Sequence, residues 1–400
     1  MGKLWVKGFG VFFILALLSC KENTNKKEIA KILQVDSLLQ IRYQKILDYP
    51  VDSVSIPRSF DPKINKIFKV APKDWTSGFY PGNLWQLYKL TENEAFKSKA
   101  RAVTAYIEKE KFNDGTHDMG FKIYSSFGEG FEVTKNGYYE NVILESAGTL
   151  ATRFNETVGS IRSWDFNKDI WEYPVIIDNM MNLELLFEAT KISGDSAFHK
   201  IAVQHANTTL INHFRDNTSS FHVIVYDTVS GNVIDKVTHQ GYNDSSSWAR
   251  GQAWGIYGFT MCYRYTNNPV YLEQAEKSAE FYLKHKNLPD DGIPFWDFDD
   301  PSLPNALKDV SAATVVASAL VELASFTNKS LYSDYSKLVL RTLKSNEYIL
   351  SPEIEAPFIL KHSTGNWPKK DEMDVSINYA DFYFLELMLR LENSTHKKTP

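Results

Sequence analysis

Residues 186–195 read Leu-Phe-Glu-Ala-Thr-Lys-Ile-Ser-Gly-Asp, an amphipathic run that stops at Ser193 and Gly194 and is followed by a new one. Helical spacing of apolar residues, then a hydroxyl residue, glycine and aspartate, is typical of one helix ending and the next beginning. A Thr or Ser with an aromatic residue five positions later recurs at Thr91/Phe96, Ser193/Phe198, Thr266/Tyr271 and Thr327/Tyr332. These repeats predict tight hairpins of paired helices.

The distances between the repeats are uneven, which argues against a regular solenoid. Paired helices closed into a toroid, with functional loops inserted between them, fit this spacing better, and we predict an all-α fold. One segment departs from the helical pattern. Alternating β-branched residues at 221–226 and 233–237, around the Gly-containing turn 227–232, predict a small β-hairpin.

Polar segments that carry Gly and Trp separate the predicted helices, at 113–130, 158–178, 239–254, 289–309 and 361–376. Binding and catalytic residues concentrate on loops that a rigid scaffold holds in place. In a barrel of paired helices these loops meet at one end. We expect them to form the substrate pocket.

The N-terminus has the pattern of an export signal. Lys3 and Lys7 precede an apolar run from Phe9 to Leu18, and Leu17-Leu18-Ser19-Cys20 follows. The run is shorter than the ~20 residues of a membrane span, which favours a bacterial lipoprotein signal over residues 1–20, cleaved before Cys20, rather than an uncleaved anchor helix. We predict a polar tether at 21–30 and one catalytic domain at 31–395.

This pattern also predicts the protein's location, on the periplasmic or outer-membrane surface. A lipid on Cys20 would then be its one attachment to the membrane. After lipidation a single cysteine, Cys262, remains, which excludes an intramolecular disulfide and a cysteine zinc cluster.

Composition narrows the class of partner. The net charge is −5, so the chain offers no basic field for a phosphate backbone, and we do not expect nucleic acid as a partner. Aromatic residues make up 14% of the chain, a content typical of proteins that stack sugar rings. The oligomeric state does not follow from these numbers.

Two acidic residues stand in unusual surroundings. Asp178 follows the apolar residues 174–177 and precedes an apolar helix, which places it at a helix N-cap facing the barrel mouth. A carboxyl group beside an apolar wall and a second acid would have a raised pKa, as a general acid needs near neutral pH. Asp118, between Gly115 and Gly120, lies in a loop that can turn sharply. Helix capping for Asp178 and a plain Asx-turn for Asp118 are the structural alternatives.

Residues 239–255 form the richest cluster of polar and aromatic residues. Arg250 and Trp254 are four apart, so on a helix they share one face and pair a carboxylate-binding fork with a stacking surface. A packed Trp with an extended Arg is the alternative. Trp75 is a second stacking candidate. His117 has no second metal ligand at helical spacing, so we predict neither a metal nor another cofactor.

Six motifs, in order along the chain, resemble those of glycoside hydrolase family 88, the unsaturated glucuronyl hydrolases, from about Pro57 to Arg390. They are residues 74–79 (Asp-Trp-Thr-Ser-Gly-Phe), 117–121 (His-Asp-Met-Gly-Phe), 159–164 (Gly-Ser-Ile-Arg-Ser-Trp), 177–182 (Ile-Asp-Asn-Met-Met-Asn), 248–254 (Trp-Ala-Arg-Gly-Gln-Ala-Trp) and 308–313 (Lys-Asp-Val-Ser-Ala-Ala).

The resemblance implies an (α/α)6 barrel and an enzyme that removes a 4,5-unsaturated uronic acid from the non-reducing end of an oligosaccharide. In that chemistry Asp178 protonates C4 of the unsaturated ring and helps water attack C5. Asp118 holds ring hydroxyls and helps to keep Asp178 protonated. The remaining substrate-binding residues implied are His117, Asn179, His222, Gln240, Arg250, Trp75 and Trp254.

Other functions remain open at this point. An unsaturated rhamnogalacturonyl hydrolase shares the barrel and the acid pair, and a polysaccharide lyase shares the acidic sugar substrate. A non-enzymatic glycan-binding lipoprotein would need only the anchor and the aromatic residues. The loop at 361–370 carries three lysines that could meet a sulfate group or remain solvated, so the natural polymer is not determined.

Overall fold

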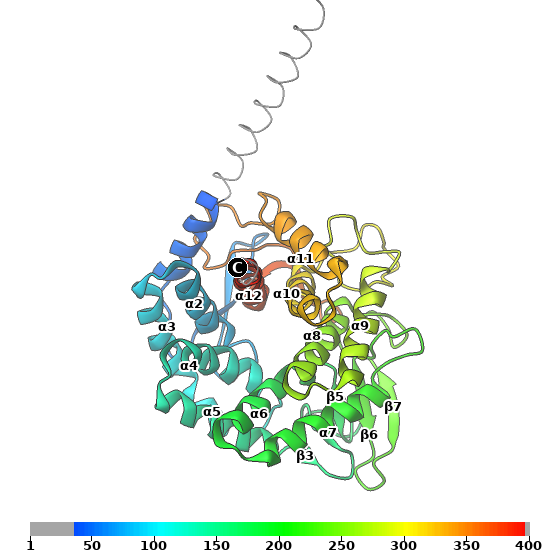
Figure 1. Ribbon diagram of the computed structural model, residues 1–400. Coiled ribbons are helices and arrows are strands. Elements are labelled where there is room, and N and C mark those ends of the chain that lie inside the picture. The colour runs from blue at the N-terminus through cyan, green and yellow to red at the C-terminus, as the bar shows by residue number, and fades with distance from the viewer. Residues whose placement is uncertain (1–35, 397–400) are drawn as a thin grey trace, which may run out of the picture.

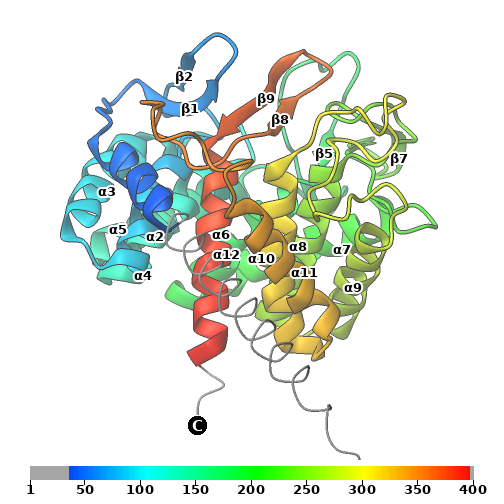
Figure 2. The same ribbon diagram turned by 90° about the horizontal axis from the view of Figure 1, so that it is seen from above.

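The computed structural model describes residues 36–396 and is mostly helical, with small β-sheets at one end of the helices (Figures 1 and 2). The predicted signal and tether, residues 1–30, lie outside the described residues. A free cysteine, Cys262, is buried.

The helices form an inner and an outer set arranged around a common centre (Figure 1). The inner set consists of α2 (Phe79–Thr91), the π-helix η2 (Gly120–Gly128) continued by α4 (Glu129–Thr134), α6 (Asn179–Ser193), α8 (Ala249–Thr266), α10 (Val310–Thr327) and α12 (Asn378–His396). The outer set consists of a helix at 36–48, α3 (Glu94–Ile107), α5 (Gly137–Ala151), α7 (Ser196–Asn212), α9 (Pro269–Leu283) and α11 (Ser330–Leu343), and a short 3₁₀ helix, η1 (Glu108–Phe112), follows α3.

Neighbouring inner helices contact one another in chain order, and the last of them, α12, contacts the first, α2. Of the described helices, α10 is long and apolar enough to cross a membrane, yet 72% of it is buried inside the fold. This burial is that of a core helix, because α8, α11 and α12 all pack against it.

The predicted helical hairpins are confirmed at all four positions, and their chemistry is visible at Ser193. Its hydroxyl donates to the carbonyl of Ala189 at 2.7 Å, which ends α6, and accepts from the amide of Asp195 at 3.1 Å. Asp195 in turn caps α7 by accepting from the amide of Ala197 at 2.8 Å. A fifth copy of the motif, Thr134/Tyr139, joins α4 to α5 and was not recognised in the sequence.

The predicted β-hairpin is also confirmed. Strands β6 (Val223–Tyr226) and β7 (Val233–Val237) pair antiparallel across the turn, and β5 (Pro174–Ile176) adds a third strand to β6. The expectation of a single hairpin was nevertheless incomplete. A four-stranded sheet has the order β2-β1-β9-β8, and β3 and β4 form a further pair. The strands are β1 (Ile56–Asp61), β2 (Lys66–Val70), β3 (Phe154–Asn155), β4 (Ser160–Ile161), β8 (Ser363–Asn366) and β9 (Asp371–Ile377).

Four of the five segments expected to be loops contain regular structure: 158–178 includes β4 and β5, 239–254 includes the start of α8, and the other two are 113–130 and 361–376. Residues 120–128, inside the predicted loop 113–130, form the π-helix η2, and residues 361–376 contain β8 and most of β9. The sheets gather at the end where the inner helices begin (Figure 2). This end of the molecule carries the predicted site residues.

Candidate active site

Asp178 is the N-cap residue of α6, as predicted, but its side chain makes no capping hydrogen bond. The side chain is buried, and Oδ2 has no hydrogen-bond partner. Strand β5 and the one residue after it, Ile177, lead directly into this position. Capping therefore does not account for the carboxyl group, which is free to act on another molecule.

Burial raises the pKa of Asp178 to about 7, because the charged form loses solvent. The positive charge of Arg250 opposes this shift, and the negative charge of Asp118 adds a smaller increase to the pKa. The raised pKa was expected, but burial contributes more to it than the neighbouring acid does. Near neutral pH the group can both donate and accept a proton, which general acid–base catalysis requires.

Asp118 lies in the turn just ahead of η2 and is partly exposed. Thr116 donates its hydroxyl to Oδ2 at 2.6 Å, and Nε2 of His117 is 3.2 Å from Oδ1. Both contacts fix the carboxylate in place. Both partners lie within two residues of Asp118, as expected for a side chain held in a local turn.

Gly120 allows the segment after Asp118 to pack closely on the start of α6. A Cβ atom at this position would lie 2.7 Å from the Cα of Asn182. Asn182 accepts a hydrogen bond from the amide of Phe121 at 3.0 Å through its Oδ1. The first turn of the helix that begins after Asp178 therefore lies against the residues that follow Asp118, and the two acids come from adjoining elements.

His222 is neutral and held in one tautomer. Its Nδ1 accepts from the backbone amides of His239 and Gln240, both at 3.0 Å, so the ring proton is on Nε2. That nitrogen lies 3.6 Å from Oδ2 of Asp178. Burial lowers the pKa of His222 well below its usual value. The ring therefore presents a hydrogen-bond donor toward the acid.

Arg250 is buried, and its guanidinium binds other parts of the protein. One terminal nitrogen donates to Asp309 and to the carbonyl of Thr364, both at 2.7 Å, and the other donates to the carbonyl of Gly365 at 2.5 Å. The predicted fork for a substrate carboxylate is thus already engaged by Asp309 and β8. Gln240 contacts the same strand, donating from Nε2 to the carbonyl of Gly365 at 3.2 Å. Both residues anchor the β8–β9 hairpin beside the site.

The two predicted stacking residues differ in exposure. Trp254 is completely buried, with ring centroids 5.3 Å from Phe121 and 5.7 Å from Tyr383, so it offers no free ring face and its predicted stacking role is wrong. Its buried indole nitrogen has no hydrogen-bond partner in the protein. Trp75 is partly exposed and packs on one side against Tyr379 at 5.0 Å. Its position suits a sugar-stacking role.

His117 and Asn179 are buried at the same end of the helices, and each has a polar atom without a partner: Nδ1 of His117 and Oδ1 of Asn179. The amide nitrogen of Asn179 donates to the carbonyl of Ile161 at 2.8 Å, which fixes its orientation. Buried polar atoms are normally satisfied by protein, water or ligand. These two atoms can receive a sugar hydroxyl or a water molecule.

Three further residues shape the site and were given no role from the sequence. Asp309 caps α10 and pairs with Arg250, and Trp248 packs on His222 with ring centroids 4.7 Å apart. Both residues lie in motifs that resemble those of family 88, so the sequence contained a signal for them. Tyr379, which supports Trp75, begins an ordinary amphipathic helix and had no such signal. Among residues 36–394, no three His, Cys, Asp or Glu side chains gather as a metal site.

Comparison with known proteins identifies the family of this chain. The model of Glycosyl Hydrolase Family 88 matches residues 54–288, which include Asp118, Asp178, His222 and Arg250. The chain belongs to glycoside hydrolase family 88. It is therefore a glycoside hydrolase, and the family and enzyme class predicted from the sequence motifs are confirmed.

Two curated members of family 88 are similar to this hydrolase over most of its length. The unsaturated glucuronyl hydrolase of Formosa agariphila is 56% identical over 392 residues, covering 96% of this chain and 98% of that protein. The unsaturated glucuronyl hydrolase of a Bacillus species is 34% identical, with coverage of 80% and 86%. Among solved structures, an unsaturated glucuronyl hydrolase specific for heparin superposes with a TM-score of 0.87 at 40% identity, covering 90% of this hydrolase and 96% of that chain.

Proposed function

We propose that this family 88 hydrolase is an unsaturated glucuronyl hydrolase that removes a 4,5-unsaturated uronic acid from the non-reducing end of oligosaccharides made by polysaccharide lyases. Its relatives in Formosa and Bacillus carry that name. A further similar structure, 29% identical, holds dGlcA-Glc-Rha-Glc. The observation that carries the proposal is the buried, uncapped carboxyl group of Asp178, with a pKa raised by burial to about 7.

The reaction is the hydration of a vinyl ether. Asp178 gives its proton to C4, the C4=C5 double bond breaks, and positive charge develops at C5, where the ring oxygen shares it. The ionised Asp178 then accepts a proton from water as the water oxygen bonds to C5. The resulting hemiketal opens and releases the neighbouring sugar. One group serves as acid and then as base, and its pKa near neutrality suits both steps.

The neighbours of Asp178 have supporting roles in this scheme. His222 directs its Nε2 proton toward Oδ2, so it stabilises the carboxylate that exists after the proton has left. Asp118, fixed by Thr116, accepts hydrogen bonds from ring hydroxyls. His117 and Asn179 offer the unpartnered polar atoms described above. Trp75 offers its partly exposed ring to the sugar.

The field at this end of the protein suits a substrate with a carboxylate. Helix N-termini carry a partial positive charge that favours anions. Asp178, Trp248 and Asp309 are the N-cap residues of α6, α8 and α10. Three inner helices thus direct their N-termini toward the site. The uronate carboxylate can be held by this field, while the guanidinium of Arg250 holds the hairpin in place.

We further propose that the inner and outer helices close into an (α/α)6 toroid within a single catalytic domain at 31–395. The contact of α12 with α2 and the pairing of each inner helix with an outer one support this. Residues 1–20 are proposed to be a lipoprotein signal, which places the enzyme on the periplasmic or outer-membrane surface through Cys20. Radiolabelled palmitate incorporation that is lost in Cys20→Ser would support the anchor, and equal labelling of both proteins would contradict it.

The activity is tested with unsaturated disaccharides that differ in linkage and sulfation. Hydration destroys the C4=C5 chromophore, so ultraviolet absorbance should fall during the reaction. An elimination reaction would make it rise, and a binding protein would leave it unchanged. Either of the last two results across the panel overturns the proposal. The disaccharide that turns over fastest identifies the natural polymer.

A further inference from the structure

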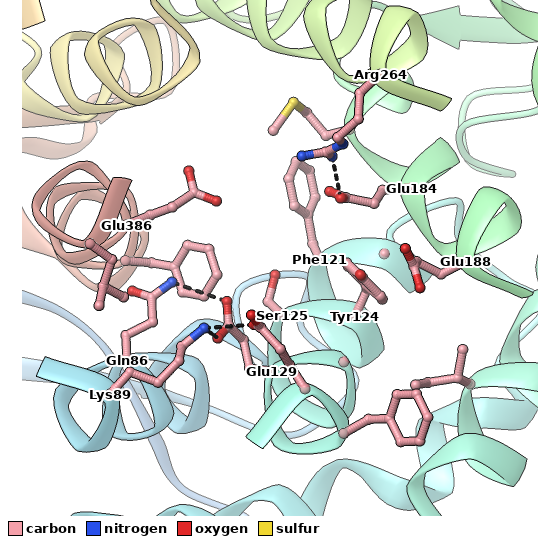
Figure 3. A pocket seen from close by; sticks show the side chains of 18 of the residues that line it. Gln86, Lys89, Phe121, Tyr124, Ser125, Glu129, Glu184, Glu188, Arg264 and Glu386 are labelled. Atoms are coloured by element: carbon pink, nitrogen blue, oxygen red, sulfur yellow. Dashed lines mark hydrogen bonds and ion pairs between the residues drawn. The ribbon is translucent and has the colours of Figure 1, made fainter. Parts of the chain in front are cut away.

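A cavity of about 890 Å³ lies inside the ring of inner helices and extends to their C-terminal ends. Its lining includes Glu184 and Glu188 of α6 and Glu386 of α12. Figure 3 shows these carboxylates facing a common space from opposite sides. Gly120, Phe121 and Met181 also line the cavity, so one side of it approaches the residues that follow Asp118 and Asp178.

Acidic groups outnumber basic ones in the lining. Six carboxylates face five cations, namely Glu129, Glu132, Glu140, Glu184, Glu188 and Glu386 against Lys89, Lys135, Lys191, Arg264 and Arg390. The deeper cations are paired with protein carboxylates: Arg264 with Glu184 at 2.5 Å, and Lys89 with Glu129 at 2.6 Å. Arg390 pairs with Glu386 at 3.2 Å. These three cations are therefore paired with protein carboxylates, and Lys191 pairs with Glu188 in the same way.

A buried hydrogen-bond acceptor in the lining has no partner. Gln86 is fully buried, its Nε2 donates to Oε1 of Glu129 at 3.2 Å, and its own Oε1 makes no hydrogen bond. A buried polar atom of this kind calls for a ligand or a water molecule. Since Oε1 can only accept, the ligand must be a donor. An ammonium group is such a donor.

Two other features favour positive charge in this cavity. The inner helices end here, and helix C-termini carry a partial negative charge. Aromatic rings, whose faces attract cations, complete the wall: Phe121, Tyr124, Phe131, Tyr257 and Tyr265. Burial also raises the pKa of Glu184 to about 7 and that of Glu129 above its usual value. A nearby cation would stabilise the ionised form of these carboxyl groups.

We propose that this cavity is a second binding site, for a small organic cation of the polyamine class. A cavity of about 890 Å³ is far larger than a metal ion and is within the usual range for a small organic ligand. None of the residues proposed for the hydrolase reaction lines the cavity, so the proposed ligand is distinct from the sugar substrate. Its occupant would contact η2 and α6, the two helices that begin just after Asp118 and Asp178.

The test is calorimetric titration of the whole protein with spermidine at low ionic strength, compared with Glu188→Gln. Glu188 accepts from the hydroxyl of Tyr265 at 2.6 Å and pairs with Lys191 three residues on. Glutamine keeps the hydrogen-bond acceptor and removes the charge. We expect spermidine to bind the wild type and its affinity to fall roughly tenfold in Glu188→Gln.

Glu94→Gln is the matched control. Like Glu188, Glu94 accepts a hydrogen bond from a tyrosine hydroxyl, that of Tyr88, and pairs with the lysine three residues later, Lys97. Unlike Glu188, it lies outside the cavity. It should bind spermidine as the wild type does. Gln86→Met is a second cavity variant that should also weaken binding. Equal spermidine affinity in the wild type and the three variants would show ordinary surface counterion binding and would overturn the proposal. The absence of binding at millimolar spermidine would overturn it as well. So would equal binding of lactose, which is neutral. Turnover of unsaturated disaccharides is a separate measurement and is unaffected by these outcomes.

Discussion

Nε2 of His222 lies 3.6 Å from Oδ2 of Asp178, while Nδ1 of the same ring accepts two backbone amides from residues 239 and 240. The histidine therefore links the loop that carries Gln240 to the acid. Its two nitrogens have different tasks, which two substitutions can separate. Asparagine places an acceptor near the position of Nδ1, and glutamine places a donor near that of Nε2.

We expect His222→Asn to retain the loop anchor and near-normal thermal stability but to lower kcat on the order of tenfold to a hundredfold, because the donor to the Asp178 carboxylate is gone. His222→Gln should retain more of kcat and lose more stability. Steady-state kinetics and thermal unfolding of both variants distinguish these effects. Equal losses of kcat and of stability in the two variants would contradict the division of tasks.

Asp178→Asn should lower kcat by about 10³-fold, because the amide can neither protonate C4 nor accept the proton of water. Substrate binding should change little, since the amide has the same shape as the acid. The fall of ultraviolet absorbance measures the rate, and calorimetric titration with an unsaturated disaccharide measures the affinity. A variant with more than a tenth of the wild-type rate would assign the acid to another residue.

The pH dependence of activity should follow the pKa of Asp178, which burial raises to about 7. The proton-donating form is lost as pH rises through that value, so kcat should decline by about tenfold for each further pH unit. Arg250 lowers this pKa by its positive charge. A flat kcat between pH 6 and about pH 9 would show that proton transfer by this group does not limit the reaction.

The same group should make folding stability depend on pH. Asp178 is protonated in the folded protein up to a pH of about 7, but in the unfolded chain it ionises above a pH of about 4. Protonated Asp178 therefore stabilises the fold at low pH, and this stabilisation is lost as pH rises through the pKa of Asp178 in the folded protein. Asp178→Asn has no such loss. Its melting temperature relative to the wild type should rise between about pH 4 and about pH 7, the span of the two pKa values. A constant difference would be evidence against the raised pKa.

Arg250→Lys should destabilise the fold by about 3 kcal/mol, because lysine cannot reach Asp309 and the carbonyls of residues 364 and 365 together. The β8–β9 hairpin would lose its anchor, so KM should rise more than kcat falls. Denaturant unfolding and steady-state kinetics test this. A stable variant with only a weaker affinity for the uronate would restore the direct carboxylate contact first predicted for this residue.

The helix pairs could be predicted because their signal is local. Ser193 makes its helix-ending hydrogen bonds to residues four before and two after it, so ten residues contain the whole cause. The same holds for Asp178, whose place at the start of α6 follows from adjoining residues. Asp118 was singled out by its place between Gly115 and Gly120, and its role was taken from the family resemblance. The structure shows the reason for the proximity of the two acids in the close approach of Gly120 to Asn182.

The errors concern contacts between distant parts of the chain. Trp254 was expected to offer a ring face, but Phe121 and Tyr383, far away in sequence, cover it. Arg250 pairs with a carboxylate 59 residues away, which no local pattern reveals. Strand β8 is Ser-Thr-Gly-Asn, with too few apolar residues to be recognised as a strand. Its position comes from pairing with β9 and from Arg250.

The buried amide of Asn83 in α2 donates to the carbonyl of Asn378 in α12, 295 residues later, at 3.1 Å. Contacts of such sequence separation form late in folding, because the whole intervening chain must first be ordered. A ribosome that has released only the first two thirds of this protein has therefore delivered both acids but not Tyr379, which packs against Trp75. We expect the nascent chain to remain inactive until its final helix emerges.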